Sequence, residues 1–494
     1  PADENRPQFE DVITKDRNDY RSNRLFRGAV QFGDNIYGFA IDRNLKGTDE
    51  EESATAMYFD DAGEFLHSNT LINQPLFNRL YFDLNGNGDL TDDDPVHAEM
   101  TMLHSTSRPA FFTDFPPMQL KTVSDGTTYD YAVALNTFIS ECEGELRCQA
   151  DFQTTVYREG EIRIGDHLIP IALIDYDGNG RFNDFAYAMK PDHLDEYCRG
   201  GGDKIYLNPK LRQESNSELE NRPLCGIDLA PWISWEGKLY DVTVSASGNT
   251  LTLEPSDTPG EYVQHLNPDY SATFFNEQGV MKIFGDDAGQ AILPIGEWRL
   301  MNYHIDGNRL DWDKKSFEES LDKSDDGTAD FQAILRLISG DSSDPEPTFC
   351  NGAAGLDVDS VTIVEGETLE LPFGPSYRAL AVPTLSWGGG VNIEIELVDA
   401  MGLTCSGMRI GGKLPPPPYY VVTNTKGEEI HREKFPRPFS GFTSEMFDRA
   451  YWKPPLDHDS EYVITIEGIN TGPFTVEPEE GAIIKLPPQS DQPT

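Results

Sequence analysis

The sequence predicts an all-β protein built of several antiparallel, β-sandwich-like modules. Two observations predict this fold class. Apolar and polar residues alternate in many short runs, as they do from Leu25 to Ile41 around a turn at residues 33–35. Clusters of Gly, Asp and Asn separate these runs at intervals of roughly ten residues, which is typical of antiparallel sandwiches. With 494 residues, of which 38% are hydrophobic, the chain is long enough for about three domains of roughly 150 residues each.

Changes in composition divide the chain into five parts. Residues 1–24 form a polar N-terminal arm and residues 487–494 a polar tail, and both have a composition that is disordered without partner contacts. Residues 25–258 form a β region that carries two candidate calcium loops. Residues 259–356 form a β module plus a linker, and residues 357–486 form a C-terminal β-sandwich-like module.

The stretch from Tyr81 to Pro95, which reads YFDLNGNGDLTDDDP, has the pattern of a calcium loop. An EF-hand-type loop supplies oxygen ligands from positions 1, 3, 5, 7, 9 and 12, with glycine at position 6 for a sharp turn. Gly88 is that glycine when position 1 is Asp83. The predicted ligands are Asp83, Asn85, Asn87, the carbonyl of Asp89, Thr91 and Asp94, with Asp92 as a further carboxylate. The alternative is an acidic surface turn, since Asn-Gly is an ordinary turn dipeptide.

A second stretch, DYDGNGRFND, repeats the pattern in the same register. The predicted ligands are Asp175, Asp177, Asn179, the carbonyl of Arg181, Asn183 and Asp184. Position 12 is Ala186, so Asp184 at position 10 has to supply the closing carboxylate. Both stretches follow a strand-like apolar run, and neither precedes a clear amphipathic helix. The sequence therefore predicts EF-hand-like calcium loops on a β scaffold.

A third acidic stretch is a weaker match to the same pattern. Its candidate ligands are Asp322, Ser324, Asp326 and Asp330, with Gly327 as the turn residue. A solvated acidic turn explains this stretch equally well.

The charge is strongly negative, with 39 basic and 85 acidic residues and a net charge of −46. Such a surface repels nucleic acid and anionic membranes, and we expect no nucleic-acid partner. It also repels itself, so that the folded state gains from bound cations. A salt-rich habitat is a second explanation of the acidity. No apolar run reaches the ~18 residues that a membrane-spanning helix needs.

The six cysteines show no CxxC motif, which argues against zinc and haem sites. Nearness in sequence favours the disulfide pairs Cys142–Cys148, Cys198–Cys225 and Cys350–Cys405, and free core thiols are the alternative. Disulfides, calcium loops and high acidity together indicate a secreted or cell-surface protein. The start at Pro1 is what a mature product has after its signal segment is removed.

Several stretches resemble a group of exported proteins from Planctomycetes and related bacteria. They are the two calcium-loop stretches, residues 234–255, residues 293–300 and residues 391–418. The resemblance implies export and calcium binding but no activity. The chain departs from the group between Cys198 and Cys225, where GGGDKIYLNPKLRQES stands in place of a further Asp/Asn/Gly loop.

No HExxH or GxSxG motif is present, and an acid pair for glycoside hydrolysis cannot be picked out among 85 acids. We therefore expect that the protein is not an enzyme. The expectation is a secreted calcium-binding structural protein that self-assembles with other copies of itself into a filament, sheath or surface layer. The first alternative is a monomeric adhesin or carbohydrate-binding protein, and a secreted hydrolase is the second. A glycan platform for the first alternative has five candidate residues, Trp232, Trp235, Trp298, Trp387 and Trp452.

Overall fold

The computed structural model describes most of the chain. The described residues are 7–22, 24–43, 55–59, 77–104, 110–142, 145–164, 167–190, 198–207, 226–308, 310, 348–353, 358–386, 389–437, 446–455, 460–478 and 481–486. Among them, almost every regular element is a strand, and the one helix is α1 (Phe9–Val12). The predicted all-β class is therefore confirmed, with antiparallel pairing in most of the ladders. No described helix has the length and apolar character needed to cross a membrane.

The N-terminal part consists of two sheets that share one core. The first has the order β1-β2-β4-β5, with bounds Phe26–Phe32, Asn35–Asp42, Arg79–Phe82 and Val96–His97. The second has the order β3-β6-β7-β8-β9, with bounds Thr55–Phe59, Met100–His104, Ala110–Ser124, Thr127–Cys142 and Glu145–Thr154. β1 and β2 form the hairpin that the alternation around residues 33–35 predicts. Inward-facing side chains of both sheets pack together, among them Phe32, Phe82 and Leu135.

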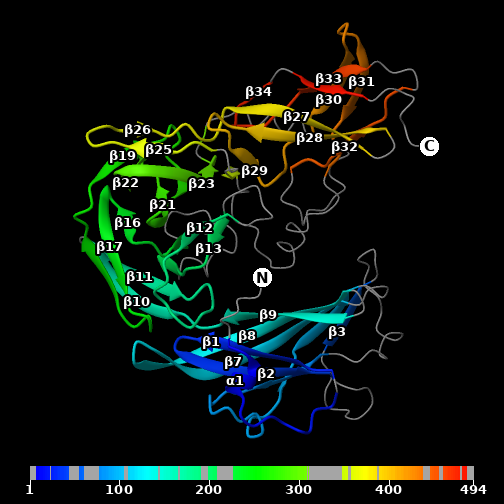
Figure 1. Cartoon of the computed structure of the whole chain (residues 1–494). Helices are drawn as coiled ribbons and strands as arrows, with labels where there is room; N and C mark the ends of the chain where they lie inside the picture. The colour runs from blue at the N-terminus through cyan, green and yellow to red at the C-terminus, as the bar shows by residue number, and fades with distance from the viewer. Residues whose placement is uncertain are drawn as a thin grey trace.

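Three small sheets continue the chain, drawn in cyan and green in Figure 1. One has the order β10-β11-β14-β15, with bounds Arg158–Ile164, His167–Ile174, Lys204–Leu207 and Ile227–Asp228. A second pairs β12 (Tyr187–Met189) with β13 (Cys198–Gly200). The third has the order β16-β17-β18, with bounds Trp232–Trp235, Lys238–Val244 and Leu251–Pro255.

The C-terminal half is organised around a sheet with the path β21-β20-β23-β24-β29-β28-β27-β34. Its bounds are Gly279–Phe284, Tyr270–Asn276, Gly296–Asp306, Phe349–Ala353, Thr404–Arg409, Val391–Val398, Tyr377–Leu385 and Val476–Pro478. β25 (Val361–Ile363) and β32 (Ala450–Trp452) pair beside this path. Because β24 pairs with β29, this sheet continues across the expected boundary between residues 356 and 357.

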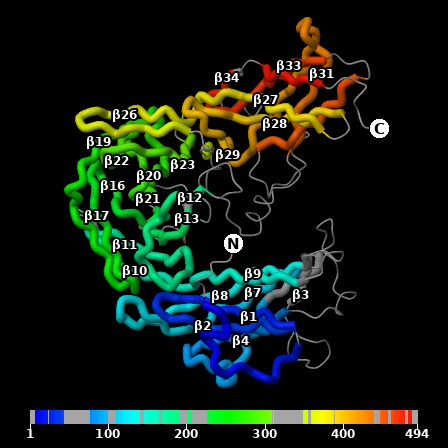
Figure 2. The backbone as a smooth tube through the Cα atoms, in the orientation of Figure 1, coloured from blue at the N-terminus to red at the C-terminus, as the bar shows by residue number. Residues whose placement is uncertain are grey.

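Two further sheets complete this half. One has the order β22-β19-β26, with bounds Gln290–Pro294, Gly260–Gln264 and Leu369–Glu370. The other has the order β31-β30-β33-β35, with bounds Glu429–Lys434, Tyr419–Asn424, Glu461–Glu467 and Ala482–Lys485. Figure 2 shows the tube passing in chain order from the N-terminal sheets through the central strands to these C-terminal strands.

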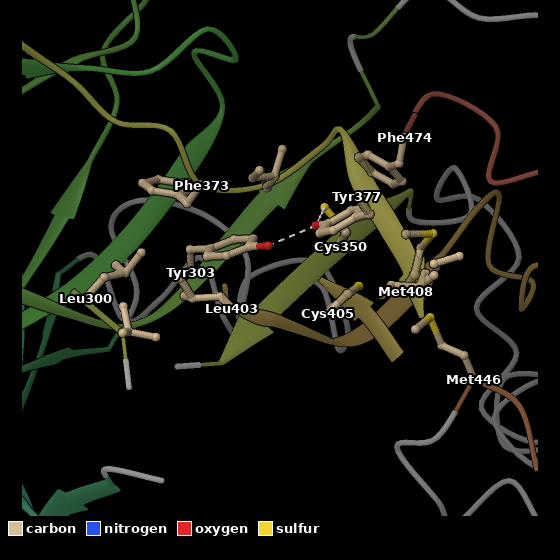
Figure 3. Packing of buried hydrophobic residues seen from close by; sticks show 14 of the residues in the cluster. Leu300, Tyr303, Cys350, Phe373, Tyr377, Leu403, Cys405, Met408, Met446 and Phe474 are labelled. Carbon is tan, nitrogen blue, oxygen red and sulfur yellow. Dashed lines mark hydrogen bonds between the residues drawn. The ribbon is translucent and has the colours of Figure 1, made fainter. Parts of the chain in front are cut away.

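The cysteines correct a prediction. Cys350 on β24 and Cys405 on β29 are free, buried thiols in the C-terminal core, and Cys148 on β9 is also free. Figure 3 shows Cys350 beside Tyr377, whose hydroxyl donates a hydrogen bond to its sulfur at 3.2 Å. The Cys350–Cys405 and Cys142–Cys148 bridges are therefore not formed, because nearness in sequence carries no information on the direction of side chains. Cys225 and the side chains of Cys142 and Cys198 lie outside the described residues.

Candidate metal sites

Loop 1 (residues 83–94) follows β4, and its first carboxylate is fully buried. The Asp83 carboxylate accepts hydrogen bonds from the backbone N–H groups of Asn87 at 3.0 Å and Gly88 at 2.9 Å. The Asn87 amide donates to Oδ2 of Asp92 at 2.9 Å, and its oxygen accepts from the N–H of Asp89 at 2.7 Å. These bonds bend the backbone around its own oxygen side chains.

Loop 2 (residues 175–186) follows β11 and repeats this network bond for bond. The Asp175 carboxylate accepts from the N–H groups of Asn179 at 3.2 Å and Gly180 at 2.7 Å. The Asn179 amide donates to Oδ2 of Asp184 at 2.9 Å, and its oxygen accepts from the N–H of Arg181 at 2.8 Å. The two sequence stretches that share one pattern therefore share one local conformation.

The glycine at position 6 is required in both loops. Gly88 has φ +75° and Gly180 has φ +83°, a region that other residues rarely adopt. A Cβ on Gly88 would lie 2.8 Å from the carbonyl oxygen of Val12, and one on Gly180 would lie 2.5 Å from the nitrogen of Gly33. Position 8 anchors each loop below this turn, since Leu90 and Phe182 are fully buried.

The structure adds a carboxylate to loop 2 that the sequence analysis missed. Asp203, just before β14, is fully buried, and one ligand atom each from Asp175, Asp177 and Asp203 lie within 4.8 Å of one another. The Asp203 carboxylate accepts from the N–H groups of Tyr176 at 3.1 Å and Asp184 at 2.9 Å. Only the sheet pairing of β11 with β14 brings it here, so no spacing rule within the loop could find it.

A second missed carboxylate, Asp93, lies in loop 1. Asp93 is 8% exposed, and its Oδ2 has no hydrogen-bond partner among the described residues. Burial, and then the negative charges of Asp83 and Asp92, raise the pKa of Asp93 to about 6. Asp94, the predicted closing ligand, is exposed.

The remaining predicted ligands lie toward the outside of the loops. The side-chain oxygens of Asn85 and Asp177 accept from the position-5 N–H at 3.0 and 3.3 Å. Thr91 donates to Asp89 at 2.5 Å, and Asp89 also pairs with Lys15 at 2.6 Å. Asn183 is half-buried. The third candidate loop, with Asp322, Ser324, Asp326 and Asp330, lies outside the described residues.

The donor set fits a hard divalent cation. It consists of carboxylate, amide and carbonyl oxygens, the ligand type that calcium prefers. Burial is the largest cause that raises the pKa of Asp175 to about 7 and the pKa of Asp203 to about 8. A cation at these carboxylates would offset the cost of burying their charges. The buried Oδ2 of Asp93 without a partner indicates the same need in loop 1.

Each loop also holds another segment of the chain. In loop 1, the Gly88 carbonyl accepts from the N–H groups of Thr14 and Lys15, and the N–H of Leu90 donates to the Lys15 carbonyl. The Arg17 guanidinium donates to the carbonyls of Leu90 and Asp93 at 3.1 and 2.9 Å. The described arm, residues 7–22, therefore lies against loop 1 of its own chain.

Loop 2 connects the N-terminal sheets to the small sheets that follow. The N–H of Gly33 in the β1–β2 turn donates to the carbonyl of Asn179 at 2.8 Å. From β8, the Tyr129 hydroxyl donates to the carbonyl of Gly180 and the Tyr131 hydroxyl donates to Asp175.

Of the five tryptophans named for a glycan platform, Trp298 and Trp452 are buried in the C-terminal core. Trp387 lies outside the described residues. Trp232 and Trp235, with Phe284, line a cavity of about 210 Å³ between β16 and β21, together with Asp228, Glu236 and Lys282.

Comparisons of the chain with family models, with curated proteins and with solved structures gave no significant match. The two loops and this cavity are therefore interpreted from their own chemistry.

Proposed function

We propose that the chain is a secreted calcium-binding structural protein that assembles with copies of itself. The observation that carries the proposal is the pair of loops with one hydrogen-bond network, each placed where it holds two parts of the chain together. In loop 2 this junction contains three acidic groups within 4.8 Å. A cation at such a junction would offset the repulsion between the carboxylates and so stabilise it.

Calcium would act as a structural ion in both loops. An ion that binds only the folded state stabilises it by about 2.7 kcal/mol per site at a hundredfold excess over Kd. In loop 1 the gain is transmitted to the arm through the Gly88 carbonyl, and in loop 2 to β8 through Tyr131. Calcium would therefore strengthen these junctions, which lie beside the hydrophobic core that the sheets share.

The self-assembly part of the proposal rests on charge. Copies with a net charge of −46 repel one another, and divalent cations between acidic faces would allow them to pack. The arm does not add to this support, since its described residues lie on their own chain.

The test is a measurement of particle size by light scattering and negative-stain microscopy, with calcium and after chelation with EGTA. We expect large ordered particles in calcium that dissociate on chelation. Single chains under both conditions would overturn the assembly. A melting temperature that calcium does not raise would overturn the calcium role, because a bound structural ion must stabilise the folded state.

A second candidate function, glycan binding, is favoured by two observations. The cavity lined by Trp232 and Trp235 combines aromatic walls with acidic groups, as small-ligand pockets do. Tyr176 in loop 2 and Tyr187 just after it are 55% and 52% exposed. A glycan array with wild type and Trp235→Ala tests this function: binding that the variant loses supports it, and no binding by wild type counts against it.

A further inference from the structure

We infer that Asp93 and Asp203 are the closing metal ligands of loop 1 and loop 2, which complete the two calcium sites from different places in the chain. The inference rests on the proposed calcium binding and names the closing ligands of both sites. It replaces Asp94 in the predicted ligand set of loop 1 and adds a ligand to loop 2.

The two carboxylates reach their loops by different routes. Asp93 is position 11 of loop 1 itself and directly follows Asp92, whose Oδ2 accepts from the Asn87 amide. Asp203 comes from outside loop 2 and accepts from the N–H of Tyr176, the residue after the first ligand Asp175. One ligand atom each from Asp203, Asp175 and Asp177 lie within 4.8 Å of one another.

Both carboxylates are buried, so a bound cation would offset the cost of their charges. Asp203 is fully buried and Asp93 is 8% exposed, in a chain with abundant exposed positions for acids. A buried carboxylate oxygen without a partner is costly, and the Oδ2 of Asp93 has none among the described residues. Asp93 lies within loop 1, between Asp92 and the exposed Asp94. A bound cation supplies the missing partner.

Loop 2 cannot supply this carboxylate from its own sequence. Position 11, where loop 1 has Asp93, is Phe185 in loop 2, and this side chain is 40% exposed. The chain instead delivers Asp203 through the turn at Gly201 and Gly202, which have φ +44° and +74°. A Cβ on Gly202 would lie 2.4 Å from the nitrogen of Ala186, so only glycine fits this close approach.

The backbone around Gly202 also binds residues of loop 2. Its N–H donates to Oδ2 of Asp177, a predicted ligand, at 3.1 Å, and the N–H of Asp203 donates to the Asp184 carbonyl. Site 1 is therefore complete within one loop, whereas site 2 exists only when the segment 198–207 lies against its loop. Calcium at site 2 should order that segment.

The experiment compares calcium binding by four variants of the full chain. Asp93→Asn and Asp203→Asn remove the inferred ligands, and Asp94→Asn and Asp287→Asn remove the same charge from exposed positions. Isothermal titration calorimetry gives the number of ions and their affinities, and melting curves in EGTA check that each variant is folded. We expect each ligand variant to lose one high-affinity ion, with affinity there weaker by about a hundredfold or more, and each control to bind as wild type.

Hydrogen exchange provides a second measurement. Calcium should protect residues 198–207 in wild type and in Asp93→Asn but not in Asp203→Asn. Asp203→Glu, which keeps the charge but displaces it, serves where Asp203→Asn does not fold, and it should also lose the ion. One outcome would overturn this inference and leave the proposed calcium binding intact. In it, Asp83→Asn and Asp175→Asn each lose an ion, but Asp93→Asn and Asp203→Asn retain every ion. If Asp83→Asn and Asp175→Asn also retain every ion, calcium binding at the loops is itself wrong.

Discussion

The Tyr131 hydroxyl on β8 donates a hydrogen bond to Oδ2 of Asp175, and the two oxygens lie 2.6 Å apart. Both side chains are fully buried. The bond links the longest hairpin of the N-terminal sheets to the first ligand of loop 2. Through this contact, a change in the conformation of loop 2 would affect the N-terminal core.

Replacing Tyr131 with Phe removes this donor and leaves the buried oxygen to the N–H of Gly180. We expect the free energy of unfolding to fall by about 1–3 kcal/mol, because the acceptor keeps its burial and loses a partner. Urea unfolding in EGTA measures this loss. Tyr157→Phe is the matched control, since Tyr157 is 52% exposed, and it should change stability by less than about 0.5 kcal/mol. Equal losses in both variants would show that the bond contributes nothing.

The anchor at position 8 of loop 2 gives a second prediction. Phe182 is fully buried, packs edge-on against Tyr131 and lies under the Arg158 guanidinium at 4.5 Å. Phe182→Ala should cost about 3–5 kcal/mol through lost burial and a cavity. Leu168→Ala, at a 53% exposed position on β11, should cost far less. Both values come from urea unfolding, and a small loss for Phe182→Ala would show that the loop collapses into the space.

The arm should respond to calcium. Because its backbone binds the Gly88 and Leu90 backbone, disorder of loop 1 on chelation should release it. We expect trypsin to cut at Lys15, Arg17 or Arg21 in EGTA and much more slowly in calcium, with mass spectrometry identifying the sites. Cutting that is equally fast in both conditions would separate the arm from the metal site.

Arg17→Ala tests the same coupling without chelation. The variant loses the two hydrogen bonds to loop 1 and the contact with the Tyr81 ring at 4.6 Å, so the arm should be cut rapidly even in calcium. Lys121→Ala is the control. It breaks an ion pair whose side chains are 72% and 79% exposed, and such pairs contribute less than about 1 kcal/mol.

Features that depend on neighbouring residues could be predicted from the sequence. The hairpin of β1 and β2 follows from alternation, and the shared conformation of the two loops follows from their shared pattern of Asp, Asn and Gly. Asp203 could not be predicted, since it reaches its loop through the pairing of β11 with β14. The docking of the arm is likewise set by contacts between residues distant in sequence, such as Lys15 with Asp89.

The free thiols in the C-terminal core lead to a chemical prediction. Cys350 is fully buried, Cys405 is 4% exposed, and burial raises the pKa of Cys405 to about 12. Since thiolates are the reactive form, Ellman's reagent should not label either residue in the native protein and should label both in denaturant. Peptide mass spectrometry without reduction identifies the residues. A linked pair of peptides that contain Cys350 and Cys405, two mass units lighter than the two free peptides together, would show instead that this disulfide forms.

His304 on β23 gives the chain a pH dependence in the core. Its Nδ1 lies 2.7 Å from the side-chain oxygen of Asn351, and its buried Nε2 has no partner among the described residues. Burial lowers the pKa of His304 below its ordinary value of 6.5, although the Asn351 bond and Asp306 act in the opposite direction. The unfolded chain therefore takes up this proton more readily than the folded one. The resulting stability is present above pH 6.5 and is lost as the pH falls below it, by at most about 1.4 kcal/mol per pH unit.

His304→Gln, which keeps an amide donor near Asn351, should lack this loss. The measurement is urea unfolding of both proteins between pH 5.5 and 7.5 in EGTA. The carboxylates with raised pKa, Asp93, Asp175 and Asp203, change stability in the opposite direction, because the folded state binds their protons more tightly. These carboxylates are present in wild type and in His304→Gln, so their contributions cancel when the two free energies of unfolding are subtracted. A difference that does not change between pH 7.5 and 5.5 would show that His304 takes up its proton equally well in the folded state.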